Sequence, residues 1–118
     1  MDYRARLQAV CAMDPIESFE RSLDGDEPAA SASPAVRAIW HGLRGEWDVA
    51  HELAQAQSDA DGAWVHAWLH RIEGDLANAD YWYRQAGRPA RRDDTRIEGL
   101  EIARALIGGA GGEERRDR

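Results

Sequence analysis

Residues 65–79 read VHAWLHRIEGDLANA and residues 36–50 read VRAIWHGLRGEWDVA, so one pattern occurs twice at an interval of 29 residues. Identical residues meet in this register at Gly45 and Gly74, at His41 and His70, and at Ala50 and Ala79. Apolar side chains on both sides of each glycine recur at the three- and four-residue spacing of a helix face. Glycine also adopts, without steric cost, the left-handed backbone that often ends a helix. Each copy therefore predicts two helices joined by a tight turn.

A family resemblance follows from the residues around the second turn. Gly74-Asp75-Leu76-Ala77-Asn78-Ala79, followed by Tyr83 and Ala86, resembles the turn and second helix of a tetratricopeptide repeat, and Gly45-Glu46-Trp47 with Ala50 is similar to it. In that family the glycine permits the turn, the large residue two positions later packs between helices, and the small alanine lets helix backbones approach closely. The resemblance covers residues 34–87 and implies two helix-turn-helix repeats, with an interval shorter than the usual ~34 residues.

The segment before the repeats is expected to be helical and to belong to the same domain, which spans residues 1–118. Residues 1–23 predict an N-terminal helical segment, in which Asp14 and Pro15 start one helix and residues 3–12 have the spacing of another. Residues 24–33 read DGDEPAASAS and predict a mobile linker, because they are rich in small and turn-forming residues and have no apolar period.

The segment after the repeats predicts one more helix. Residues 93–107 have Asp93 or Asp94 as the capping residue, and Ile97, Leu100, Ala103 and Ile107 fall on one arc. Two repeats alone leave helix faces unburied, so we expect this helix to cap the stack. Residues 108–118 have little apolar content and predict a disordered tail. The predicted fold class is all-α, with tandem antiparallel helical hairpins and flanking N- and C-terminal helices.

Composition excludes several classes of function. The acidic net charge of −7 predicts a soluble protein that binds neither nucleic acid nor an anionic membrane, and the presence of a single cysteine predicts a cytoplasmic location. The chain has no lysine, which excludes Schiff-base and phosphate-loop chemistry, and Cys11 is its single cysteine, which excludes an intramolecular disulfide or a multi-cysteine zinc site. No apolar run approaches the roughly 18 residues that span a bilayer.

The histidines His41, His51, His66 and His70 all lie in the repeat region. His66 and His70 are one helical turn apart, which is the spacing of a metal-chelating pair. Both project from the side of the helix opposite the apolar arc. The segment reads His-Ala-Trp-Leu-His and lacks the glutamate of an H-E-x-x-H metalloprotease motif. The sequence therefore favours solvated surface histidines and predicts neither a metal site nor a cofactor. His41 and His70, at matching positions, are expected to pack where adjacent first helices meet.

Aromatic residues are the other candidates for a binding surface. The helical arcs direct Trp68, Tyr83 and Leu76 toward the core and Tyr81 to the far side of its helix, with Trp64 and Trp82 at the edges of the apolar stripe. The candidate partner-binding residues are Trp64, His66, His70, Tyr81 and Trp82. Burial of the edge aromatics against flanking helices is the alternative interpretation.

Three functions are then open. No nucleophile with a neighbouring base and no acid–base pair of carboxylates stands out, so we expect that the protein is not an enzyme. The first hypothesis is an interaction or scaffold module that binds a peptide or protein partner through its helical-repeat surface. The second is a small metal-binding protein or enzyme that uses His66 and His70. The third is a self-associating structural protein, that is, a homo-oligomer.

Overall fold

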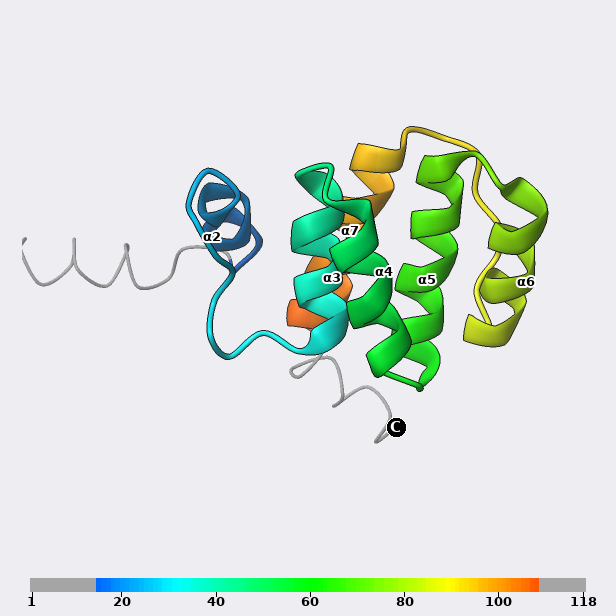
Figure 1. The fold of residues 1–118 in the computed structure, drawn as a ribbon, viewed down its shortest axis with the longest axis horizontal. Coiled ribbons are helices and arrows are strands. Elements are labelled where there is room, and N and C mark those ends of the chain that lie inside the picture. The colour runs from blue at the N-terminus through cyan, green and yellow to red at the C-terminus, as the bar shows by residue number, and fades with distance from the viewer. Residues whose placement is uncertain (1–14, 109–118) are drawn as a thin grey trace, which may run out of the picture.

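The computed structural model describes residues 15–108, and every regular element within that range is an α-helix, which confirms the all-α prediction. The helices are α2 (Pro15–Ser22), α3 (Pro34–Leu43), α4 (Trp47–Ala56), α5 (Ala60–Glu73), α6 (Leu76–Ala86) and α7 (Thr95–Ile107). Helix α2 lies at one end of the assembly and the α5–α6 hairpin at the other (Figure 1). The helix expected over residues 3–12 and most of the expected tail lie outside the described residues.

Both predicted turns form at their glycines. Gly45 and Gly74 have φ values of 84° and 90°, in the left-handed region where a side chain would strain the backbone. Adjacent helices on either side of each turn pack against each other, which gives the hairpins α3–α4 and α5–α6. Each hairpin also begins at a side-chain cap. The Ser33 hydroxyl accepts from the backbone of α3, and the Asp59 carboxylate does the same for α5.

Helix α7 packs across α3 and α5, the first helices of the two hairpins. Asp94 caps α7, which confirms one of the two capping residues that the sequence predicts for this helix. The indole of Trp68 fills the junction: a Cβ atom added at Gly42 of α3 or at Gly99 of α7 would lie 2.7 or 2.5 Å from its ring. Trp68 Nε1 donates a 2.7 Å hydrogen bond to the carbonyl of Thr95. The face shared by α3 and α5 is therefore covered by α7.

A buried charged network joins α5, α6 and α7. The carboxylate of Glu98 is fully buried and accepts hydrogen bonds from Arg71 Nη1 at 2.5 Å and from the Tyr83 hydroxyl at 2.6 Å. Arg71 Nη2 also donates to the backbone carbonyl of Asp93, at the start of the segment that leads into α7. Burial of a carboxylate is tolerated only when such donors satisfy it, so this network fixes the position of α7 on α5.

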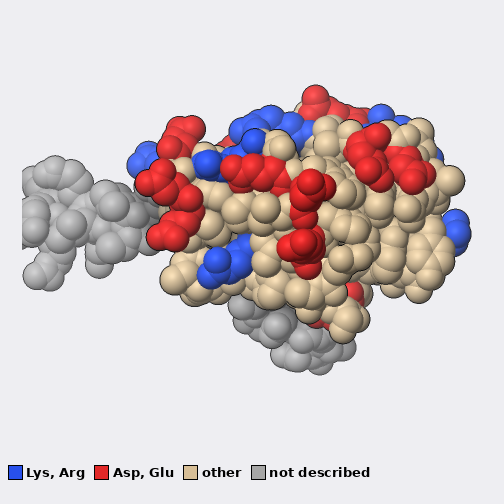
Figure 2. Space-filling view, viewed as in Figure 1, with Lys and Arg blue, Asp and Glu red and all other residues tan. Residues whose placement is uncertain are grey.

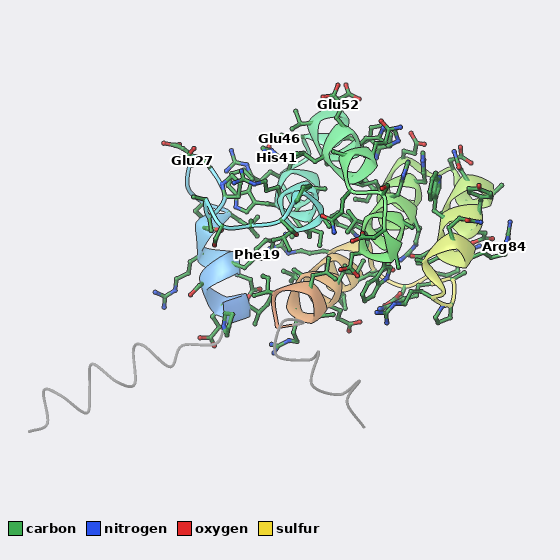
Figure 3. All side chains as sticks on the ribbon, turned by 90° about the horizontal axis from the view of Figure 1, so that it is seen from below. Phe19, Glu27, His41, Glu46, Glu52 and Arg84 are labelled. Atoms are coloured by element: carbon green, nitrogen blue, oxygen red, sulfur yellow. The ribbon has the colours of Figure 1, made fainter. Side chains whose placement is uncertain are left out.

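Helix α2 joins the same core through Phe19, which lies on the side of α2 facing the other helices (Figure 3). The indole of Trp40 donates to the Ser22 hydroxyl at 3.0 Å, and α2 also contacts α7. Residues 24–33 connect α2 to α3, and the guanidinium of Arg37 binds the carbonyls of Ala30 and Ala32 in this segment.

Two apolar side chains do not face the core as predicted. Leu76 is 41% exposed and Ile97 is 52% exposed, although the sequence directed Leu76 toward the core and placed Ile97 on an apolar arc. Leu76 is the first residue of α6, and Ile97 lies in the first turn of α7, so both stand at helix ends. The prediction was wrong there because helix period alone does not locate the end of a packing interface. Trp68 and Tyr83 are buried, as expected. No helix within residues 15–108 is long and apolar enough to span a bilayer.

Candidate metal centre

Three histidines from two helices meet between the hairpins. His66 and His70 lie one turn apart on α5, and His51 lies on α4, which packs against the same side of α5. Each of the three rings can offer one nitrogen such that all three nitrogens lie within 4.8 Å of one another. We call His51, His66 and His70 the histidine triad.

The three rings of the triad pack directly against one another. His51 Nε2 and His66 Nε2 are 2.9 Å apart, which is hydrogen-bonding distance. The rings of His66 and His70 are stacked with centroids 4.9 Å apart, and the ring of His51 stands nearly edge-on to both. In tetrahedral coordination with zinc–nitrogen bonds of about 2.0–2.1 Å, ligand nitrogens lie about 3.3 Å apart. Binding of an ion by all three nitrogens would therefore require the His51 and His66 nitrogens to separate slightly and all three nitrogens to settle at about this spacing.

Two tryptophans hold the histidine rings in place. Trp47 stacks on His51, with centroids 4.7 Å apart and planes at 12°, and Trp82 stacks on His66 at 4.0 Å and 12°. Trp47 is itself fixed, since its Nε1 donates a 2.7 Å hydrogen bond to the carbonyl of Leu69. The triad is thus enclosed by aromatic rings from α4 and α6, which restrict how the imidazoles can rotate.

Glu73 sets the orientation of His70. Its Oε2 lies 2.7 Å from His70 Nδ1, so a neutral His70 donates from Nδ1 and keeps Nε2 as its lone-pair nitrogen. Metal-binding histidines usually donate their other ring N–H to a carboxylate or carbonyl in this way. Glu73 and Asp75 also form a second possible ligand group with His70, but both of these carboxylates are exposed.

Burial favours the uncharged form of two of the three rings, those of His51 and His66. Burial lowers the pKa of His66 to about 4, and the nearby His51 and His70 act in the same direction. Burial also lowers the pKa of His51, with a further lowering from His70. A neutral imidazole is the form that binds a metal.

Acidic side chains lie on the same elements as the triad and next to it. Helix α4 carries Asp48 and Glu52, and the α5–α6 turn carries Glu73 and Asp75. Figure 2 shows acidic side chains over both regions on one face of the molecule. Glu52 points away from the helices (Figure 3), so it acts on the triad through its field and not by contact. This arrangement raises the local concentration of cations.

The expectation that His66 and His70 are solvated was wrong. They are 5% and 6% exposed, because α4 and α6 cover the polar side of α5 that the sequence assigned to solvent. His51 was not singled out as their partner. The sequence offered one signal for His51: it lies one helical turn from Trp47 on α4, the same spacing that separates His66 and His70 on α5.

The other histidine and the predicted aromatics are placed separately. His41 is hydrogen-bonded to Glu46 at 2.7 Å, and the two residues lie side by side in Figure 3. The ring of His70 packs against His51 and not against His41, which occupies the matching position in the first repeat. Trp64 is 8% exposed under the guanidinium of Arg88, and Trp82 is half-buried against His66. Tyr81 is 45% exposed, as expected. The five candidate partner-binding residues therefore do not form one exposed surface.

A scan against protein-family models, a search of curated proteins and a search of solved structures found no match for this chain.

Proposed function

We propose that the protein binds a divalent transition-metal ion at the histidine triad. The observation that carries this proposal is the convergence of three imidazole nitrogens, from His51, His66 and His70, within 4.8 Å of one another. The tryptophans against His51 and His66 and the carboxylate on His70 restrict the rings to that arrangement before any ion arrives.

The donor set selects a class of ion. Three neutral imidazoles suit Zn²⁺, Cu²⁺ and Ni²⁺, whereas Mg²⁺ and Ca²⁺ require oxygen ligands. His51 Nε2 and His66 Nε2 lie at hydrogen-bonding distance from each other. An ion held by both rings would replace this contact with two coordinate bonds, and the acidic side chains near the triad would favour its positive charge.

Isothermal titration calorimetry with ZnCl₂ and NiCl₂ on the full chain tests this proposal. We expect saturable binding of one ion per chain and a loss of about 100-fold or more in affinity for His51→Ala, since removal of a direct ligand should exceed the 10–100-fold effect of an outer partner. His41→Ala is the matched control, because His41 also pairs with a glutamate at 2.7 Å but lies outside the triad. The affinity of this variant for the metal ion should equal that of the wild type. Equal affinity in both variants would place the metal elsewhere.

A second candidate, self-association through the helical-repeat surface, is favoured by one observation. Tyr81 is a large aromatic side chain that remains 45% exposed beside Trp82. Exposed aromatic residues are common energetic centres of interfaces. Helix α7 covers the face shared by α3 and α5, so we place this surface on α6. Light scattering of the wild type and Tyr81→Ser tests self-association: a concentration-dependent mass that the substitution removes supports it, and a monomeric mass for both excludes it.

A further inference from the structure

An apolar groove lies at the end of the molecule opposite the α5–α6 hairpin. It is enclosed by α2, the connecting segment 24–33, the first turn of α3 and the last turn of α7. Its large side chains are Phe19, Val36, Leu106 and Ile107, and its volume is about 370 Å³. An apolar cavity of about 150 Å³ accepts a benzene-sized group. This groove therefore has room for two or more apolar side chains.

The polar groups of the groove do not call for a polar ligand. The Ser22 hydroxyl accepts from Trp40 Nε1 and donates to the carbonyl of Phe19, and the Ser33 hydroxyl caps α3. Among the described residues, no charged side chain lines the groove. Because covering apolar surface is favourable in water, the groove favours an apolar occupant.

Both parts of the chain outside the described range adjoin this groove. Pro15 is the first described residue and Ile107 the last but one, and both line the groove. Residues 109–118 have no apolar side chain larger than alanine, and residues 113–118 are all charged. They have nothing large to bury there, which leaves residues 1–14 as the occupant within this chain.

Residues 1–14 have the apolar side chains that the groove can accept. At about 100° per residue, one arc of about 100° on a helix holds Tyr3, Leu7, Val10 and Cys11. The chain is also long enough to bring them there. At no more than about 3.6 Å per residue, the five-residue step from Pro15 back to Val10 spans up to about 18 Å. Since Pro15 itself lines the groove, this length allows the segment to turn back into it.

We propose that residues 1–14 of the same chain dock in this groove through their apolar arc, with Leu7 and Val10 against Leu106 and Ile107 of α7. The docked segment would hold α2 in place, because α2 has only eight residues and so short a helix is not stable alone in water. The inference is independent of the metal proposal, since no histidine lines the groove among the described residues.

Charge around the groove favours the same occupant. Within residues 15–33, which form α2 and the connecting segment, five acidic side chains and one basic side chain are exposed. Figure 2 shows acidic side chains gathered at this end of the molecule. On the segment 1–14, Arg4 and Arg6 stand beside the two edges of the apolar arc, and the acidic residues Asp2 and Asp14 lie near its ends. Docking through the arc thus brings two positive side chains to an acidic rim.

The reactivity of the Cys11 thiol tests the proposal on the full chain. Cys11 is the single cysteine and lies on the docking arc, so a disulfide reagent such as dithionitrobenzoate reports on this segment alone. We expect the native protein to react at least about tenfold more slowly than the same chain in urea, because the segment must first leave the groove. Equal rates overturn the proposal. Protection that grows with protein concentration shows a second copy in the groove, which overturns docking within one chain.

Two substitutions in the connecting segment locate the docking site. Ala29→Trp fills the groove from its exposed wall, and we expect Cys11 to react within about twofold of its rate in urea. Ala30→Trp is the matched control, because Ala30 is the neighbouring exposed residue and does not line the groove. Its reaction rate should stay within about twofold of the wild type. Equal rates in the two variants overturn the role of the groove.

A second pair of substitutions acts from the segment and leaves residues 15–108 unaltered. Leu7→Asp places a charge on the docking arc, and Gln8→Asp places the same charge outside it. We expect Leu7→Asp alone to raise the Cys11 reaction rate at least about fivefold. A rise in both variants, or in neither, overturns docking through this arc.

Discussion

Tyr83→Phe is the sharpest test of the network that holds α7 in place. The change removes one hydroxyl and leaves the ring packing intact, so the Glu98 carboxylate loses its 2.6 Å hydrogen bond and keeps only Arg71. Hydrogen bonds to charged groups contribute about 1.5–3 kcal/mol. Because both side chains are almost completely buried, water cannot replace the lost donor. We expect a loss of about 2 kcal/mol in the free energy of unfolding.

Urea denaturation followed by circular dichroism measures this loss. A loss of about 2 kcal/mol lowers the midpoint by roughly 1–2 M for a small domain. Tyr81→Phe is the matched control, since Tyr81 lies two residues earlier on the same helix and is exposed, and its effect should stay within about 0.5 kcal/mol. If Tyr83→Phe is no more destabilising than Tyr81→Phe, the buried network does not contribute as argued.

The same network predicts strong coupling between its charges. Arg71→Met leaves a buried carboxylate without its counter-charge and should cost about 3–5 kcal/mol. The double variant Arg71→Met with Glu98→Leu removes both charges, so it should cost less than the sum of the two single changes. Additive losses would contradict a direct interaction between Arg71 and Glu98.

Three further predictions concern the triad and the core. In EDTA, the free energy of unfolding should fall by up to about 3 kcal/mol as the pH drops from 6.5 toward 4. The reason is that over this range the unfolded chain binds a proton at His66 and the folded chain does not. A free energy of unfolding that does not change with pH would contradict this. Gly99→Ala should cost about 1–3 kcal/mol in urea denaturation, since its Cβ would meet the Trp68 ring. Glu73→Gln should weaken Zn²⁺ binding 10–100-fold by calorimetry, whereas Glu46→Gln, in the matching pair of the first hairpin, should not.

The helices could be predicted from the sequence because their signals are local. Ser33, Asp59 and Asp94 cap the helices that follow them, and Gly45 and Gly74 mark the turns by their backbone freedom alone. These residues act within a few positions of where they stand, so a single sequence is enough to locate them. The tetratricopeptide resemblance stays a prediction, since it concerns ancestry and not helix position.

The candidate site could be predicted only in part because it depends on packing. Helix α5 is covered by α3, α4, α6 and α7, so its polar side has no solvent to face, and His66 and His70 become buried. The amphipathic pattern assumes one wet side, which a central helix lacks. The sequence did identify that pair and its spacing. The partnership with His51 and the burial of Glu98 required knowing which helices are neighbours.

X-ray absorption spectroscopy of the zinc-loaded protein tests the metal centre most directly. The account predicts three imidazole ligands with zinc–nitrogen distances of about 2.0–2.1 Å and one further light-atom ligand. The His51→Ala protein should show fewer imidazoles at the ion. A zinc spectrum with at most one imidazole, or one identical in His51→Ala, would contradict binding at the histidine triad.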